Sequence, residues 1–342
     1  MSFVTTILKW FHENGRVLPW RETTDPYAIW LSEIILQQTR IEQGRPYWES
    51  FMQRWPQVEN LAAASEDEVL REWQGLGYYS RARNLHTAAK QVVALGGFPK
   101  TIEGLRALKG VGDYTAAAIG SIAFGLPVAV VDGNVYRVLA RHFGISTPIN
   151  SSEGKKEFAL LAQELIEEVP VRHSQPISHI SPMSLTNPIS AYNQAMMDFG
   201  AVQCTPQRPN CLFCPLQESC IALQEGRVDE LPVKQKTLKV KERHLTYIYI
   251  RYRNMTAIHR RPAGDIWQGL YEPWITDEVP AGSVLLRSGV KHVLTHRILY
   301  ADFWLWEPQK RPSLPDDYFW IKEKDIDQYG VPRLVEILLE AL

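Results

Sequence analysis

The sequence predicts two domains, an all-α domain over residues 1–223 and an α+β domain over residues 244–342, joined by a basic linker over 224–243. Apolar residues recur at helical spacing in the first part, and no long run of period two interrupts them. From Leu245 onward, β-branched and aromatic residues follow the pattern of strands. A chain of 342 residues is long enough to bury two separate cores.

Composition indicates a soluble globular protein, with 45% hydrophobic and 22% charged residues. No apolar run approaches the roughly 20 residues that a membrane span needs. Phe3, Ile7, Trp10 and Phe11 are spaced as in a docked amphipathic helix, not a signal peptide, so we expect a cytoplasmic location. A net charge of −1 gives no indication that the protein binds nucleic acid, although a local basic patch would suffice to bind phosphates.

Individual elements follow from local patterns. Apolar residues predict a helix over Ile29–Thr39, and small apolar residues predict a closely packed helix over Ala116–Phe124. Strands are expected over Thr246–Tyr252 and Leu299–Trp306. An amphipathic helix over Arg333–Leu342 then ends the α+β domain.

Two segments carry no periodicity. Glu225–Arg243 is polar and basic, which is typical of a linker and also compatible with an arm that contacts phosphates. His173–Pro188 is rich in Ser, Pro and His, and we expect a surface loop there. The spacing of His173 and His179 does not support a metal site.

All four cysteines lie close together, with the spacing C-x6-C-x2-C-x5-C: Cys204, Cys211, Cys214 and Cys220. In a cytoplasmic chain, clustered thiols bind metal more often than they form disulfides. A single C-x2-C pair with wider flanking gaps favours one 4Fe-4S cluster over zinc or free structural thiols.

A Gly-x-Gly turn predicts a site for a phosphate. Leu108–Ala116 has the pattern of helix, tight turn and helix, and Gly110 and Gly112 can expose backbone N–H groups at the second helix. An ordinary helical turn is the alternative. Twenty residues later, Val131–Val135 places Asp132 before Gly133, where it is either a catalytic carboxylate or a helix N-cap.

These segments together resemble the MutY-type adenine DNA glycosylases of the endonuclease III, or helix-hairpin-helix, superfamily. The same resemblance extends to Leu18–Arg21, Trp30–Thr39, Gly75–Leu85 and Asn193–Asp198, so it covers the first domain. It implies a helical core over about residues 22–133 and an iron–sulfur subdomain built from the N-terminal helix and about residues 134–223. It also implies that the cluster loop, including Arg208, faces the DNA backbone.

Three residues would carry the chemistry. Glu33 is a lone carboxyl in an apolar stretch, and burial would raise its pKa and keep it a proton donor for adenine N7; a solvent-facing helix residue is the alternative. Asp132 would stabilise the oxocarbenium-like transition state at the sugar. Bifunctional relatives have a lysine where this chain has Tyr114, and Lys109 lies one turn too early, so we expect no lyase step.

The resemblance also implies the residues that contact DNA. Asn134 would orient Asp132, and Tyr114 would pack near the flipped nucleotide. Gln38 and Thr39 would fill the space that base flipping leaves, and Tyr78 would wedge beside the opposite base; core packing is the alternative for Tyr78 and Tyr79. The adenine pocket would be lined by Trp20, Arg21, Leu36 and Gln194.

The second domain resembles the Nudix-like domain of that family. Ile266–Pro273 resembles its W-x-x-P segment, and Val293–His296 stands where the family has an F-S-H loop that recognises 8-oxoguanine. Here leucine replaces phenylalanine and threonine replaces serine, which leaves Thr295 and His296 as the candidates for this contact. No Nudix box is present, so nucleotide hydrolysis is not expected; a generic DNA-orienting module is the alternative.

The sequence therefore predicts a monofunctional, monomeric adenine DNA glycosylase that acts on double-stranded DNA with A:8-oxoguanine or A:G mispairs. Two alternatives stay open. One is a thymine or uracil mismatch glycosylase of the same superfamily. The other is a non-catalytic binder of damaged DNA or a cluster-based redox sensor.

Overall fold

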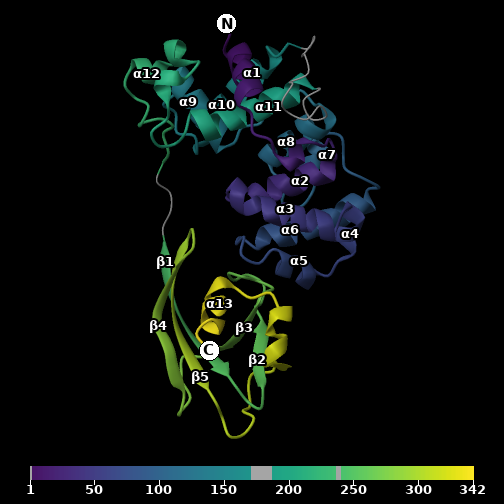
Figure 1. Ribbon diagram of the computed structural model, residues 1–342, viewed down its shortest axis with the longest axis vertical. Coiled ribbons are helices and arrows are strands. Elements are labelled where there is room, and N and C mark those ends of the chain that lie inside the picture. The colour runs from purple at the N-terminus through teal and green to yellow at the C-terminus, as the bar shows by residue number, and fades with distance from the viewer. Residues whose placement is uncertain (1, 171–186, 236–239) are drawn as a thin grey trace. The chain divides into compact units, whose positions relative to one another are not determined.

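The computed structural model describes residues 2–170, 187–235 and 240–342 (Figure 1). His173 and His179 lie outside these residues, as do Lys236 and Lys239 of the predicted linker. The α-helices are α1 (Phe3–Asn14), α2 (Pro26–Leu36), α3 (Ile41–Arg54), α4 (Val58–Ala63), α5 (Glu66–Glu72), α6 (Ser80–Ala94), α7 (Ile102–Arg106), α8 (Asp113–Phe124), α9 (Gly133–Phe143), α10 (Ser152–Glu167), α11 (Pro188–Asp198), α12 (Ile221–Gln224) and α13 (Arg333–Leu339). The strands are β1 (Lys241–Ile250), β2 (Met255–Arg260), β3 (Tyr271–Ile275), β4 (Val284–Val293), β5 (Arg297–Trp306) and β6 (Tyr318–Lys322).

The chain forms two compact units that do not follow chain order. The first contains residues 1–41 and 88–236, and the second contains residues 42–87 and 237–342. Side chains of the sheet domain explain why residues 42–87 join it. Arg260 Nη2 donates to the carboxylates of Glu66 and Asp67, both at 2.9 Å, and the Tyr271 hydroxyl donates to Asp67 at 3.0 Å.

The N-terminal helix α1 docks by its apolar face, as its spacing predicts. The Ser2 hydroxyl accepts from the Thr5 N–H at 3.3 Å and caps the helix. Ile7 and Phe11 are fully buried, in a core that also contains residues of α9, α10 and α11. This helix therefore belongs to the hydrophobic core of the first unit.

Helices α2 and α8 pack against each other in the first unit. Asp25 caps α2, and Pro26 occupies its first turn, where a missing N–H costs nothing. Small residues on α8, including Ala117 and Ala118, bury against Ile29 of α2. Their small size permits the close approach that brings Glu33 on α2 to Tyr114 on α8.

The second unit contains a six-stranded sheet in the order β4-β5-β1-β3-β2-β6. Strands β1 and β5 are parallel, and the other pairs are antiparallel. Helix α13 lies against the sheet (Figure 1), and its residues Leu334, Val335 and Leu338 are buried in a core shared with residues of the strands. An all-α core followed by an α+β domain is thus confirmed, although β1 begins at Lys241, inside the predicted linker.

The segment before β1 is also more ordered than a free linker. The Ile149 N–H donates to the Val233 carbonyl at 3.0 Å, and Asn150 exchanges two hydrogen bonds with the backbone of Gln235. Leu231 is 2% exposed. Residues up to 235 are therefore held on the first unit by backbone pairing and by a buried side chain.

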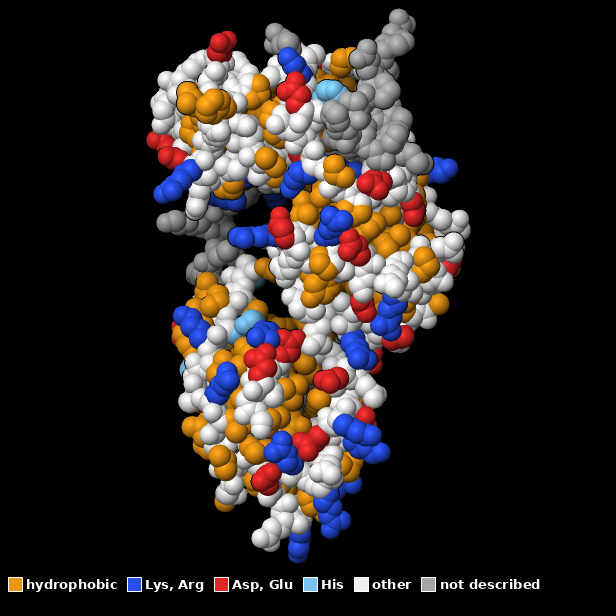
Figure 2. Space-filling model, in the orientation of Figure 1, with side chains coloured by type: hydrophobic (Ala, Val, Ile, Leu, Met, Phe, Trp, Pro, Cys, Tyr) orange, Lys and Arg blue, Asp and Glu red, His pale blue; other side chains and the backbone are white. Residues whose placement is uncertain are grey.

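Charge and hydrophobicity on the surface are mixed. On the face shown in Figure 2, basic and acidic side chains are interspersed over the described residues, which agrees with the net charge of −1. Among those residues, no helix combines the length and the apolar character needed to cross a membrane.

Candidate active site

Asp132 stands at the N-terminus of α9 as its N-cap. Its Oδ1 accepts from the N–H groups of Asn134 and Val135 at 2.9 and 2.8 Å, and its Oδ2 accepts from Asn134 Nδ2 at 2.7 Å. The N-cap reading of Asp132 is therefore confirmed, and its catalytic role stays a prediction. Three donors and the positive end of a helix dipole favour its ionised form.

Glu33 faces Tyr114, whose hydroxyl donates to Glu33 Oε2 at 2.5 Å. Burial raises the pKa of Glu33 to about 7, and the charge of Asp132 adds to this rise; the Tyr114 hydrogen bond and Arg21 act in the opposite direction. The side chain of Glu33 is only partly covered from solvent. It is therefore an acid near neutral pH that a ligand can reach.

The two carboxyl groups differ in environment. Burial also raises the pKa of Asp132, but hydrogen bonds from Val135 and Asn134 and the charge of Arg137 favour its ionised form. Glu33 receives the single Tyr114 hydrogen bond among the described contacts. One site therefore holds a proton donor and a fixed anion, the pair that glycosidic bond cleavage requires.

Two arginines on α9, which the sequence interpretation missed, extend from this site to the cysteines. Arg137 Nη2 donates to Asn134 Oδ1 at 2.8 Å, and Arg137 Nε donates to the Cys204 carbonyl at 2.7 Å. Arg141 donates to the carbonyls of Thr205 and Pro206 at 2.7 and 3.2 Å. Their i,i+4 spacing on α9 was the available signal, since it places both on one helix face.

The predicted adenine-pocket residues lie in the first unit and are mostly buried. Trp20 is 7% exposed, and Leu36 is partly exposed at the end of α2. Gln194 is 1% exposed and donates to Ser190 Oγ at 2.9 Å, while its Oε1 has no partner in the described part of the chain. A buried acceptor without a donor is costly, so this atom is a candidate contact for a ligand N–H.

Arg21 is engaged by a buried carboxylate. Its guanidinium binds both oxygens of Asp198 at 2.8 and 2.9 Å, and Arg16 binds the same carboxylate. Burial raises the pKa of Asp198, but the hydrogen bonds from Arg21 and Arg16 outweigh burial and lower it to about 2. Asp198 therefore fixes Arg21, a connection that the sequence interpretation did not assign.

The Gly-x-Gly turn joins α7 to α8. Gly110 has φ +77°, a left-handed conformation that favours glycine, and Gly112 is the N-cap of α8. Gln91 Oε1 accepts from the Lys109 N–H at 2.7 Å and supports the turn. Gln38, just after α2, is exposed with φ +58°, and Thr39 beside it is partly exposed.

The four cysteines line one cavity in the first unit, together with Arg141. Arg141 Nη1 lies 3.5 Å from Cys204 Sγ, and the Cys220 thiol donates to the Arg141 carbonyl at 3.5 Å. Arg208, between the first two cysteines, is exposed with φ +48°. Among the described residues, no set of three or more His, Cys, Asp or Glu is arranged to hold a single metal ion.

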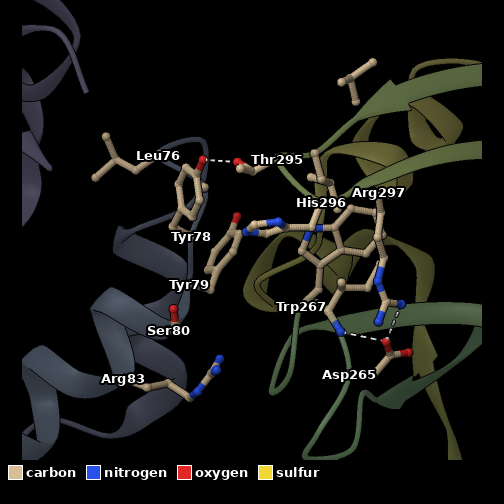
Figure 3. Close-up of a pocket in the computed structure, with 14 residues that line it drawn as sticks. Leu76, Tyr78, Tyr79, Ser80, Arg83, Asp265, Trp267, Thr295, His296 and Arg297 are labelled. Carbon is tan, nitrogen blue, oxygen red and sulfur yellow. Dashed lines mark hydrogen bonds and ion pairs between the residues drawn. The ribbon is translucent and has the colours of Figure 1, made fainter. Parts of the chain in front are cut away.

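A second candidate site lies in the second unit, in a pocket between residues 76–83 and the β4–β5 hairpin (Figure 3). Thr295 and His296 are exposed at the tip of that hairpin. The Tyr78 and Thr295 hydroxyls are hydrogen-bonded to each other. Tyr78 is 51% exposed whereas Tyr79 is 6% exposed, so core packing applies to Tyr79 and not to Tyr78.

Two protein families match this chain, one in its helical part and one in its sheet domain. Residues 31–168 match the HhH-GPD superfamily of base excision DNA repair proteins. Residues 246–341 match the NUDIX domain.

Solved structures share the helical fold. A thermostable thymine-DNA glycosylase is 30% identical with a TM-score of 0.56, over 65% of this chain and 95% of that one. An endonuclease III in a non-covalent DNA complex is 20% identical with a TM-score of 0.52, over 65% and 94% of the two chains.

Two relatives bear the same description. An adenine DNA glycosylase of Buchnera aphidicola (subsp. Acyrthosiphon pisum) is 34% identical, and the match covers 99% of this chain and 97% of that protein. The adenine DNA glycosylase of Mus musculus is 41% identical over 68% of this chain, which spans 44% of the mouse protein. The family that the motifs resemble is therefore confirmed, and the chain belongs to the adenine DNA glycosylases of the helix-hairpin-helix superfamily.

Proposed function

We propose that the protein is a monofunctional DNA glycosylase that excises adenine opposite 8-oxoguanine or guanine. The observation that carries this proposal is the acid–anion pair of Glu33 and Asp132 beside Tyr114. The names of the relatives support adenine as the base that leaves.

Glu33 supplies the proton. Adenine leaves poorly as an anion, so protonation at N7 lowers the barrier to breaking the glycosidic bond. A carboxyl with a pKa of about 7 is protonated in a large fraction of molecules at neutral pH. The orphaned Gln194 Oε1 supports the choice of base, since it can accept from the exocyclic N6–H of adenine.

Asp132 stabilises the sugar as the bond breaks. Positive charge develops at C1′, and an anion that is already held by three donors needs no reorganisation to stabilise it. Tyr114 cannot form an imine with the sugar, so the enzyme leaves an intact abasic site. Its hydroxyl instead tunes Glu33.

Contacts with DNA come from several elements. The turn with Gly110 and Gly112 presents backbone N–H groups to a phosphate. Gln38 and Thr39 fill the space left by the flipped adenine, and Tyr78 wedges beside the opposite base. The exposure of Gln38 and Tyr78 supports these roles, because a buried side chain could not enter the base stack.

The NUDIX domain checks the opposite base. Thr295 and His296 at the tip of the β4–β5 hairpin would contact 8-oxoguanine, whose N7–H distinguishes it from guanine. Their exposure and the neighbouring Tyr78 support this assignment.

The cysteines would hold one 4Fe-4S cluster. A cavity that all four cysteines line supports this proposal, because thiolates are the ligands of such clusters and these four share one space. The cluster would supply a fixed shape to the loop that carries Arg208. We assign it no part in bond cleavage.

Adenine release from duplex DNA tests the proposal. A panel of A:8-oxoguanine, A:G, T:G and U:G duplexes should show release from the first two only. Asp132→Asn should slow release by about a hundredfold or more, since it removes the anion. Asp302→Asn is the matched control, because Asp302 lies on β5 and accepts hydrogen bonds from Ser288 and Gly289, in the compact unit that does not contain the proposed catalytic residues.

Three outcomes would contradict the proposal. Release of thymine or uracil with no release of adenine would indicate the mismatch glycosylase of the same superfamily. Tight binding to the adenine duplexes with no release would indicate a non-catalytic damage binder. A covalent adduct trapped with borohydride, surviving Lys109→Ala, would show a lyase step.

A further inference from the structure

The tip of the β4–β5 hairpin is held by an ionic cluster that the motifs do not mark. Thr295 and His296 form a two-residue turn, because the Leu294 N–H donates to the Arg297 carbonyl at 2.8 Å across it. The Lys241 N–H donates to the His296 carbonyl at 3.1 Å. The turn is therefore anchored at its base by Arg297 and by the start of β1.

One carboxylate, Asp265, gathers three arginines behind this turn. Its Oδ2 accepts from Arg243 Nη1 at 2.6 Å and from Arg261 Nη2 at 2.7 Å. Its Oδ1 accepts from Arg297 Nη1 at 3.3 Å and from the Ile266 N–H at 2.8 Å. Asp265 thus ties β1, β5 and the loop after β2 together, and it lines the same pocket as Thr295 and His296 (Figure 3).

Buried groups of the sheet hold the arginines around Asp265 in place. Arg261 also binds both oxygens of Glu272, which is 2% exposed, and Glu272 accepts from the Tyr247 hydroxyl at 3.0 Å. The Arg261 guanidinium lies 5.7 Å from the centre of the Trp267 ring. Trp267 has φ +57°, a strained conformation for a bulky residue, which such anchoring can maintain.

We propose that Asp265 is a positioning residue for specificity, which sets the place of the Thr295–His296 turn through Arg297 and neutralises the arginines beside the pocket. The inference rests on the proposed role of this turn in reading the opposite base. Without the carboxylate, three guanidinium groups repel one another, and the first residue of β5 loses its side-chain anchor. The added positive charge attracts phosphates of any sequence.

Asp265→Asn tests this inference in the full-length protein, by single-turnover adenine release from A:8-oxoguanine and A:G duplexes. The preference for A:8-oxoguanine should fall about fivefold, through a slower A:8-oxoguanine reaction with little change for A:G. Affinity for undamaged duplex should rise, with a steeper salt dependence. Asp265→Glu restores the charge and should recover most of the preference.

Asp302→Asn is the matched control, since Asp302 accepts from the Ser288 hydroxyl and the Gly289 N–H elsewhere on the same hairpin, both at 2.7 Å. It should leave the preference unchanged. A preference that survives in Asp265→Asn, or a loss that is equal on both duplexes or matched by Asp302→Asn at similar thermal stability, overturns the inference. If wild type itself shows no preference, the proposed reading role fails instead.

Discussion

At the scale of single residues, the site depends on how two carboxyl groups are solvated. Both are shielded from water, which raises the pKa of each. Three donors at a helix N-terminus oppose this rise for Asp132, whereas Glu33 receives one hydroxyl. The larger number of donors favours the ionised form of Asp132 more than that of Glu33.

The pH dependence follows from this arrangement. Glu33 donates only while protonated, so the rate of adenine release should fall as the pH rises above about 7. Tyr114→Phe removes a hydrogen bond that lowers the pKa of Glu33. We therefore predict that the alkaline limb of the pH–rate profile moves to higher pH in this variant, as single-turnover rates across pH 5–10 would measure.

Tyr136→Phe on α9 is the control for this profile, because the Tyr136 hydroxyl is not among the groups that act on Glu33. An alkaline limb that stays in place in Tyr114→Phe would contradict the prediction. So would a limb that moves equally in both variants.

At the scale of elements, α9 connects Asp132, the proposed catalytic carboxylate, to the loop that carries the cysteines. Asp132 caps it, and Arg137 and Arg141 follow one turn apart on one side. A Cβ on Gly200 would lie 2.6–2.9 Å from atoms of Asn134. Glycine at this position therefore permits the segment before Cys204 to pack against the start of α9. Arg137 on this helix therefore connects the cysteine loop to Asn134, which in turn contacts Asp132.

Loss of Arg137 should therefore affect catalysis as well as folding. Arg137→Gln leaves buried carbonyls of Gly200 and Cys204 without their donor, which should destabilise the fold by about 2 kcal/mol. It also frees Asn134 Oδ1, so adenine release should slow by more than DNA binding weakens. Thermal melting, duplex affinity and single-turnover rates would measure the three effects.

Arg227→Gln serves as the control, since Arg227 makes ion pairs with Glu225 and Glu230 at the surface, where such pairs contribute little. Equal losses of binding and rate in Arg137→Gln would show that Arg137 only supports the fold.

At the scale of the whole molecule, the two candidate sites belong to different compact units. Glu33 and Asp132, the residues proposed for excision, lie in the first unit. The predicted wedge Tyr78 lies in the second unit with the hairpin tip. The chain thus groups the proposed wedge with the proposed reader of the opposite base. Sequence order alone assigns Tyr78 to the helical domain.

The predicted iron–sulfur cluster can be tested chemically on the purified full-length protein. We predict about four irons and four acid-labile sulfides per chain. Cys211→Ser should lower the iron content and weaken DNA binding or lower thermal stability. The rate of adenine release from bound DNA should change less than these quantities. Zinc without iron in the native protein would contradict the cluster. A cysteine variant that binds DNA normally yet releases no adenine would contradict its purely structural role.

Local sequence predicted much of this protein. Helix α1, the core of α2, the turn before α8, the strands β1 and β5 and helix α13 follow from periodicity, capping residues and glycines, which act between near neighbours. The motifs around Glu33, Asp132 and the cysteines likewise lie within short segments. The family followed from these motifs, and the comparisons confirm it.

Contacts between distant segments could not be predicted in this way. No local pattern pairs the residues in three of these contacts. They are Asp198 with Arg21, Arg137 with the Cys204 carbonyl, and Asp265 with Arg243. The union of residues 42–87 with the sheet domain is of the same kind. The sequence by itself determined which elements form and which family they build, because propensity and periodicity are local. Only the tertiary structure decided which charges meet, because burial and pairing depend on the packing of segments far apart in the chain.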